Sequence, residues 1–68
     1  MKVNVSKLML KILEAGFSVE EFAKELGINR ATLYRKLADI EKFTIREVRK
    51  IKEILQLTNE EAILIFLS

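Results

Sequence analysis

The chain has 68 residues with a net charge of +2, and half of these residues are hydrophobic while only 7% are aromatic. It contains no Cys, no His and no Pro and only two Gly, which excludes disulfides and the common Cys/His zinc sites and favours packed helices over a turn-rich β fold. We therefore expect one small all-α domain over residues 1–68, of marginal stability because a chain of this length buries only about 60% of the surface that its unfolded form exposes.

The N-terminal segment predicts a helix over about residues 5–15. Apolar side chains recur there at helical spacing, at Val5, Leu8, Met9, Ile12 and Leu13. Gly16 follows, and a glycine after a helix can take the left-handed conformation that closes the helix without a Cβ clash. No apolar run reaches the roughly 18 residues that span a bilayer, so we expect a soluble cytoplasmic protein with no membrane partner.

The next two predicted helices are separated by a short turn. Ser18 with Glu21 forms a capping-box pattern and predicts the start of a second helix, which ends at Gly27. Asn29 is an N-cap candidate for a third helix at about residues 29–38. The core positions of these two helices are Phe22, Ala23, Leu26, Leu33, Leu37 and Ile40.

Two further capping boxes predict the fourth and fifth helices. Thr44 with Glu47 precedes a stripe of expected core positions at Ile45, Val48, Ile51 and Leu55, and Thr58 with Glu61 precedes the last segment. That segment contains ILIFL at residues 63–67, which has no polar face, so its period does not distinguish helix from strand.

The break at Gly27 has the spacing of a helix-turn-helix, in which the second of two short helices enters the DNA major groove. Ala23 is a small residue where the two helices must approach closely, and Leu33 anchors the second helix to the core. The side chains expected to point away from this anchor are Asn29, Arg30, Ala31, Thr32 and Arg35, with Tyr34 at the flank.

Charge is concentrated in the same region. Residues 30–52 hold eight basic and three acidic residues, a local charge of +5, whereas the rest of the chain holds four basic and seven acidic residues, a charge of −3. Arg30, Arg35 and Lys36 alone are consistent with an ordinary solvated helix face. Together with the turn spacing, they favour DNA binding, because an Arg fork can donate two hydrogen bonds to guanine O6 and N7.

These residues resemble the helix-turn-helix proteins of the Cro and phage-repressor type, the XRE-like family. The resemblance is carried by FSVEEFAKELGINRATLYRKL at 17–37 and by FTIREVRKIKEILQLTNEEAILIFL at 43–67. It implies a compact, lambda-repressor-like bundle of five helices with the helix-turn-helix in helices 2 and 3. It also implies a dimeric transcriptional regulator, such as a repressor, of a phage or mobile element in a bacterial or phage-infected cell, with a pseudo-palindromic double-stranded DNA operator as its partner.

The same resemblance implies roles for individual residues. Bases would be faced by Asn29, Arg30, Ala31, Thr32 and Arg35, and phosphates would be met by Ser18, Lys42, Thr44 and Arg46. Beyond the resemblance, we expect Tyr34 to face bases and Lys36 to meet phosphate. The LGINRATLYRKL string also resembles the Fis-type helix-turn-helix at the C-termini of some bacterial regulators. Chains of that type usually end soon after this string, whereas about thirty residues follow here, which favours the Cro-like interpretation.

Other functions fit the sequence less well. The chain offers no Gly-rich phosphate loop and neither Cys nor His, so we expect no enzyme, no metal, no cofactor and no small-molecule ligand. The main alternative is a helix-turn-helix fold that binds another protein, such as a regulator, a polymerase subunit or a toxin. An interaction module of that kind has no need for the basic residues between 30 and 52.

The C-terminal apolar run predicts a homodimer. A contiguous apolar segment at the end of so small a domain forms either core or interface. We expect Ile63 and Phe66 to fill the bundle and the interface to be formed by Leu64, Ile65 and Leu67.

Overall fold

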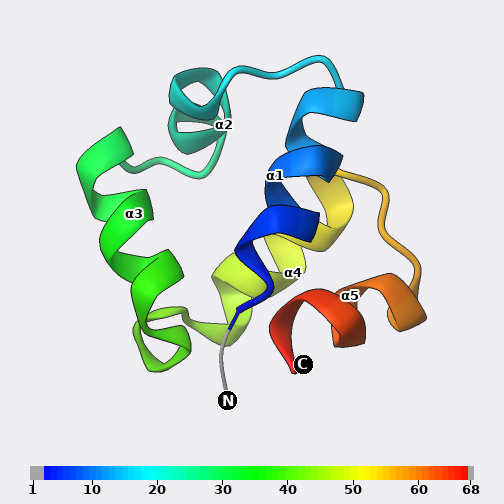
Figure 1. Ribbon diagram of the computed structural model, residues 1–68. Helices are drawn as coiled ribbons and strands as arrows, with labels where there is room; N and C mark the ends of the chain where they lie inside the picture. The colour runs from blue at the N-terminus through cyan, green and yellow to red at the C-terminus, as the bar shows by residue number, and fades with distance from the viewer. Residues whose placement is uncertain (1–2, 68) are drawn as a thin grey trace.

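A computed structural model describes residues 3–67, without the side chain of Ile40, for which the expected core position therefore lies outside the description. It contains five α-helices and one short 3-10 helix (Figure 1). Their bounds are α1 Val5–Glu14, α2 Val19–Glu25, α3 Arg30–Ala38, η1 Ile40–Lys42, α4 Ile45–Ile54 and α5 Asn59–Phe66. No strand occurs within residues 3–67, which confirms the all-α prediction and its five helices.

The helices begin at the predicted residues because local side chains satisfy their first backbone N–H groups. All three capping boxes form, at Ser18 with Glu21, Thr44 with Glu47 and Thr58 with Glu61. In each box the hydroxyl accepts from the backbone N–H of the Glu, and the carboxylate accepts from the backbone N–H of the cap residue. These contacts fix helix starts without any tertiary information.

Two glycines end helices in the predicted way. Gly16 after α1 and Gly27 after α2 have φ values of +88° and +79°. At the end of α2 the N–H of Gly27 donates to the carbonyl of Lys24, and the N–H of Ile28 donates to the carbonyl of Ala23. This pair of bonds is a Schellman motif, which requires a left-handed residue at the glycine position.

The core lies where α1 packs against the other helices. Figure 1 shows α1 in the middle of the bundle, with α3 at one edge and α5 at the opposite edge. The fully buried side chains are Leu8, Ile12, Phe22, Ala23, Leu33, Ile51 and Ile65. The N–H of Asn4 donates to the carbonyl of Ile65, which joins the start of α1 to α5. Within residues 3–67, no helix has the length and apolar character needed to cross a bilayer.

The C-terminal run is helical, and its buried face differs from the expectation. Ile65 is 0% exposed and belongs to the core, so the prediction that it forms a dimer interface is wrong. Ile63, expected in the core, is 54% exposed. The reason is helical phase: α5 extends from Asn59, and the spacing of 3.6 residues per turn places Ile63 on the same outer face as Asn59 and Glu60.

Three other residues of the predicted apolar stripes also lie outside the core, and one of them is Val5 in the first turn of α1, which is 38% exposed. Ile45, expected in the buried stripe of α4, is 75% exposed because it occupies the first turn beside the cap, before the helix packs. Leu13 in the last turn of α1 is 64% exposed. The remaining expected core positions of α4 pack as predicted, with Ile51 and Leu55 buried and Val48 partly buried.

Candidate nucleic-acid interface

The turn between α2 and α3 has the form of a helix-turn-helix. Gly27 reverses the chain, Ile28 packs partly against the core, and the Oδ1 of Asn29 accepts from the N–H of Thr32 at 2.7 Å to cap α3. Ala23 on α2 and Leu33 on α3 are both fully buried. Small and apolar residues at these two positions hold α3 against α2 and leave the other face of α3 to solvent.

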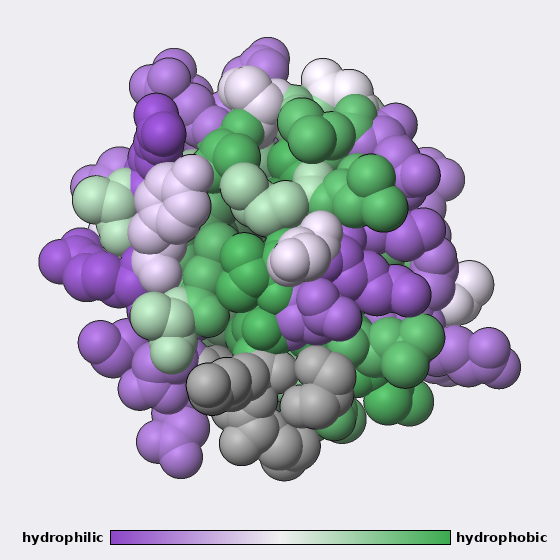
Figure 2. Space-filling view, viewed as in Figure 1, coloured by the Kyte–Doolittle hydropathy of each residue, from purple (hydrophilic) through white to green (hydrophobic). Residues whose placement is uncertain are grey.

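That outer face carries the predicted base-reading residues. Asn29, Arg30, Ala31, Tyr34 and Arg35 are exposed, and Thr32 is partly exposed. The buried side chains of α3 are Leu33 and Leu37, one helical turn apart on the opposite face. Figure 2 shows hydrophilic and weakly polar side chains over the edge of the molecule where Figure 1 places α3.

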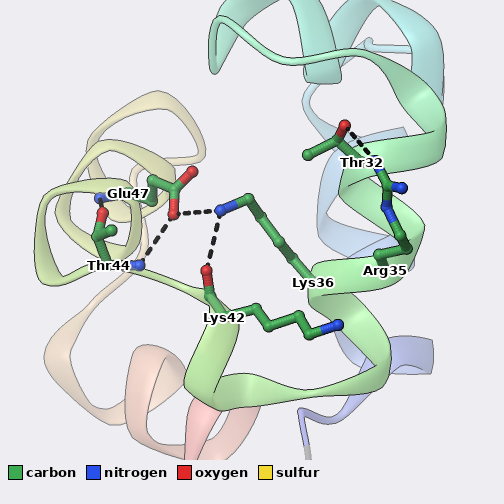
Figure 3. A network of polar contacts seen from close by, with 6 residues as sticks. All are labelled: Thr32, Arg35, Lys36, Lys42, Thr44 and Glu47. Atoms are coloured by element: carbon green, nitrogen blue, oxygen red, sulfur yellow. Dashed lines mark hydrogen bonds and ion pairs between the residues drawn. The ribbon is translucent and has the colours of Figure 1, made fainter.

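Both arginines of α3 are steadied by neighbours on the same helix. The guanidinium of Arg30 lies 5.6 Å from the centre of the Tyr34 ring, in the geometry of a cation–π contact. The Nη2 of Arg35 donates to the hydroxyl of Thr32 at 3.0 Å (Figure 3). Because these contacts lie on the exposed face, they restrict the arginine forks while leaving other guanidinium donors open to a ligand.

The predicted phosphate contacts lie on three separate segments. Ser18 and Thr44 are exposed N-caps of α2 and α4, and their hydroxyl oxygens accept from the N–H groups of Glu21 and Glu47. Lys42 ends η1, and Arg46 lies in the first turn of α4; both are exposed. A capping hydroxyl can still donate its own hydrogen, so Ser18 and Thr44 keep a donor for a phosphate oxygen.

Lys36 is placed differently from the other predicted phosphate contacts. Its Nζ lies 2.9 Å from Oε1 of Glu47 and donates at 2.9 Å to the backbone carbonyl of Lys42 (Figure 3). The side chains of Lys36 and Glu47 are only 16% and 18% exposed. No local sequence pattern predicted this pair, since its partners are eleven residues apart.

The Glu47 carboxylate is stabilised in its charged form. Burial raises its pKa, but hydrogen bonds from the Thr44 N–H and from the Lys36 ammonium outweigh burial and lower the pKa below its ordinary value. Glu47 is therefore ionised at neutral pH. This ion pair joins the last turn of α3 to the first turn of α4.

A shallow apolar groove of about 300 Å³ lies between α4 and α5. It is lined by Phe43, Thr44, Ile45, Val48, Arg49, Ala62, Ile63, Phe66 and Leu67. Ile63 and Leu64 on α5 and Leu67, which directly follows it, are each about half exposed. Figure 2 shows apolar surface over α5 and over part of α1.

Comparison with known sequences decides the family. A sequence profile described as "Bacterial regulatory protein, Fis family" matches residues 6–42, more than half of the chain. The chain belongs to this Fis family. No curated protein and no solved structure gives a significant match. The matched region contains α1 except its first residue, both helices of the helix-turn-helix and η1.

Membership of the Fis family establishes a helix-turn-helix DNA-binding regulator, of a kind that is typically not enzymatic. Of the two resemblances found in the sequence, the match is with the Fis type and does not support the Cro type specifically. The sequence prediction preferred the Cro type because the chain continues well beyond α3. That continuation, α4 and α5, lies outside the Fis-family match.

Proposed function

We propose that this chain is a small Cro-like transcriptional regulator that reads a double-stranded DNA operator with α3 in the major groove. The observation that carries the proposal is the outer face of α3, where Arg30 and Arg35 project from a helix whose other face is buried. The two arginines are five residues apart, about one and a half turns, so they address neighbouring parts of the groove. The protein would act in a bacterial or phage-infected cell, wherever its operator is carried.

The phosphate contacts are proposed for Ser18, Lys42, Thr44 and Arg46. All four are exposed, and they lie at the starts of α2 and α4 and at the end of η1. Helix N-termini carry a partial positive charge and free N–H groups, which suit a phosphate oxygen. In Figure 3 the ammonium of Lys42 points away from the Lys36–Glu47 pair and is available for such a contact.

We further propose that the regulator is a homodimer whose second copy covers the groove between α4 and α5. Ile45, Ile63 and Leu67 expose apolar surface at or beside the groove, and Leu64 lies on the same outer face of α5. Arg49 of α4 is the charged residue that lines the groove. A two-fold axis would place the same exposed apolar side chains of both copies against each other, as a self-complementary interface requires.

Base reading is tested by replacing the two arginines. Arg30→Ala and Arg35→Ala are each expected to weaken binding to the preferred duplex by roughly 1 to 3 kcal/mol and to relax the choice at one base pair per half-site. Lys42→Ala is expected to weaken all duplexes alike and to flatten the salt dependence by about one unit per half-site. The measurements are binding curves on preferred and scrambled duplexes at several salt concentrations.

Thermal melts of the same variants are the control, because exposed side chains should leave the core unaffected. If both arginine variants melt like the parent and weaken preferred and scrambled DNA equally, α3 holds phosphates and does not read bases. If neither variant changes DNA binding, the protein-interaction function is the better one. The exposed Leu10 and Leu13 on α1 are the observation that favours that second candidate.

A further inference from the structure

The ion pair between Lys36 and Glu47 is not used by the DNA contacts proposed above. Lys36 Nζ has two acceptors at 2.9 Å, the Glu47 carboxylate and the Lys42 carbonyl, and both paired side chains are largely buried. A lysine that met phosphate from this position would first have to leave both acceptors. Its contacts are with the protein itself.

These contacts join three elements that carry different parts of the proposed interface. Lys36 is in the last turn of α3, the Lys42 carbonyl belongs to η1, and Glu47 is the N3 residue of the α4 capping box. The same ammonium lies 6.0 Å from the centre of the Phe43 ring, and Phe43 packs edge-on against Phe66 of α5. The corner between η1 and α4 is thereby fixed both to α3 and to the core.

We infer that Lys36 and Glu47 are positioning residues, which set the place of Lys42 and Thr44 relative to the base-reading face of α3. This inference rests on the proposed DNA-binding function. The bases and phosphates of a duplex lie at fixed separations. For α3 to enter the groove while Lys42 and Thr44 contact phosphate, α3 and the corner between η1 and α4 must therefore keep one relative position. A single lysine bridging a carboxylate and a carbonyl across that corner supplies this constraint.

The substitution Glu47→Gln separates positioning from direct phosphate contact by the sign of its effect. Gln still fits the N3 position of a capping box, so α4 should start as before. The variant is one unit more positive and leaves Lys36 without its ionic partner. If Lys36 contacted phosphate, freeing it would tighten DNA binding and steepen the salt dependence.

Positioning predicts the opposite result. We expect Glu47→Gln to bind the preferred duplex about three- to tenfold more weakly, within the range of coupling energies found in one ion-pair network. We also expect a salt slope flatter by about one unit per half-site, because Lys42 loses its phosphate. Unchanged or tighter binding, or a steeper slope, would overturn the inference.

Glu21→Gln is the matched control. Glu21 holds the same N3 position in the capping box of α2, and it forms no ion pair within the described part of the chain. The Glu21→Gln variant has the same change of charge as Glu47→Gln. We expect it to bind DNA as tightly as the parent or slightly more tightly. If Glu21→Gln weakens binding as much as Glu47→Gln does, the effect is not specific to the Lys36 pair and the inference fails.

If Glu47→Gln does not melt cooperatively, its loss of binding could come from unfolding. A double-mutant cycle of Lys36 and Lys42 then tests the inference without changing Glu47. Lys36→Met retains the length of the side chain beside Phe43, and Lys42→Ala removes the proposed phosphate contact. Positioning predicts that Lys42→Ala costs little further affinity in the Lys36→Met background, whereas additive losses would indicate two independent phosphate contacts. If the parent protein binds preferred and scrambled duplexes equally, the proposed function itself fails. That result needs only the parent protein, so it is distinguishable from a failure of the positioning inference.

Discussion

Gln56 is the only non-glycine residue with a positive φ within residues 3–67, at +52°. It follows α4 in the position that Gly16 and Gly27 hold after α1 and α2, and it makes the same Schellman bonds: its N–H donates to Glu53, and the N–H of Leu57 donates to Lys52. A side chain in the left-handed region costs roughly 1 to 2 kcal/mol, which glycine avoids. Of the three helices that end in this motif, α1 and α2 use glycine, and only α4 has a residue with a side chain at the left-handed position.

Gln56→Gly should therefore stabilise the domain. We expect a gain of about 0.5 to 1 kcal/mol, since the relief of strain exceeds the entropy that the added glycine loses on folding. Gly27→Ala makes the reverse change and should lower the free energy of unfolding by about 1 kcal/mol. This loss comes from the positive φ alone, because a Cβ at Gly27 would meet no atom within 4 Å. Urea unfolding measures both. A neutral or destabilising Gln56→Gly would contradict the left-handed assignment.

At the scale of elements, the sequence predicted helix starts and ends well because their causes are local. A Ser, Thr or Asn cap bonds to an N–H three residues away, and a glycine closes its own helix, so neither depends on the tertiary structure. The turn between α2 and α3 was predictable for the same reason.

The face of α5 was harder to predict because the run ILIFL has no polar residue to set its phase. The signal lay upstream: extending the helical period from exposed Asn59 and Glu60 gives Ile63, Leu64 and Leu67 as outer positions and leaves Ile65 and Phe66 inside. The Lys36–Glu47 pair could not be predicted in this way. It depends on how α4 folds back beside α3, which the local sequence pattern does not encode.

The link between α1 and α5 makes stability depend on pH. The ammonium of Lys11 in α1, and then the N–H of Thr58, bond to the Glu61 carboxylate and lower the pKa of Glu61 to about 2 from an ordinary 4.5. A lowered pKa in the folded state gives stability that is fully present above about pH 4.5 and is lost as pH falls toward about 2.

Glu61→Gln should therefore melt below the parent at neutral pH, and this difference should shrink between pH 4.5 and 2. Gln preserves the capping box, so the change reports the charge and not the cap. Glu25→Gln, which alters an exposed carboxylate at the end of α2, is the control and should follow the parent at every pH. A difference that stays constant down to pH 2 would show that Glu61 titrates normally.

At the scale of the whole molecule, the proposed homodimer depends on apolar surface that the fold leaves exposed. Leu67→Lys places a charge beside the α4–α5 groove and should yield monomers by light scattering from micromolar to near-millimolar concentration. The matched control is Leu13→Lys, which alters a leucine on α1 that is also more than half exposed, and this variant should remain dimeric. Dissociation by Leu13→Lys instead would move the interface to α1, and a monomeric parent would exclude the dimer.

The central claim is that this Fis-family chain reads a DNA sequence with α3, and the most direct measurement is selection of bound duplexes from a random pool. We predict enrichment of one short motif that occurs as a pseudo-palindrome, with half-sites about 10 to 10.5 base pairs apart. The enriched motif should lose part of its preference in Arg30→Ala and in Arg35→Ala. A pool that shows no enriched motif after selection by the parent would contradict the claim.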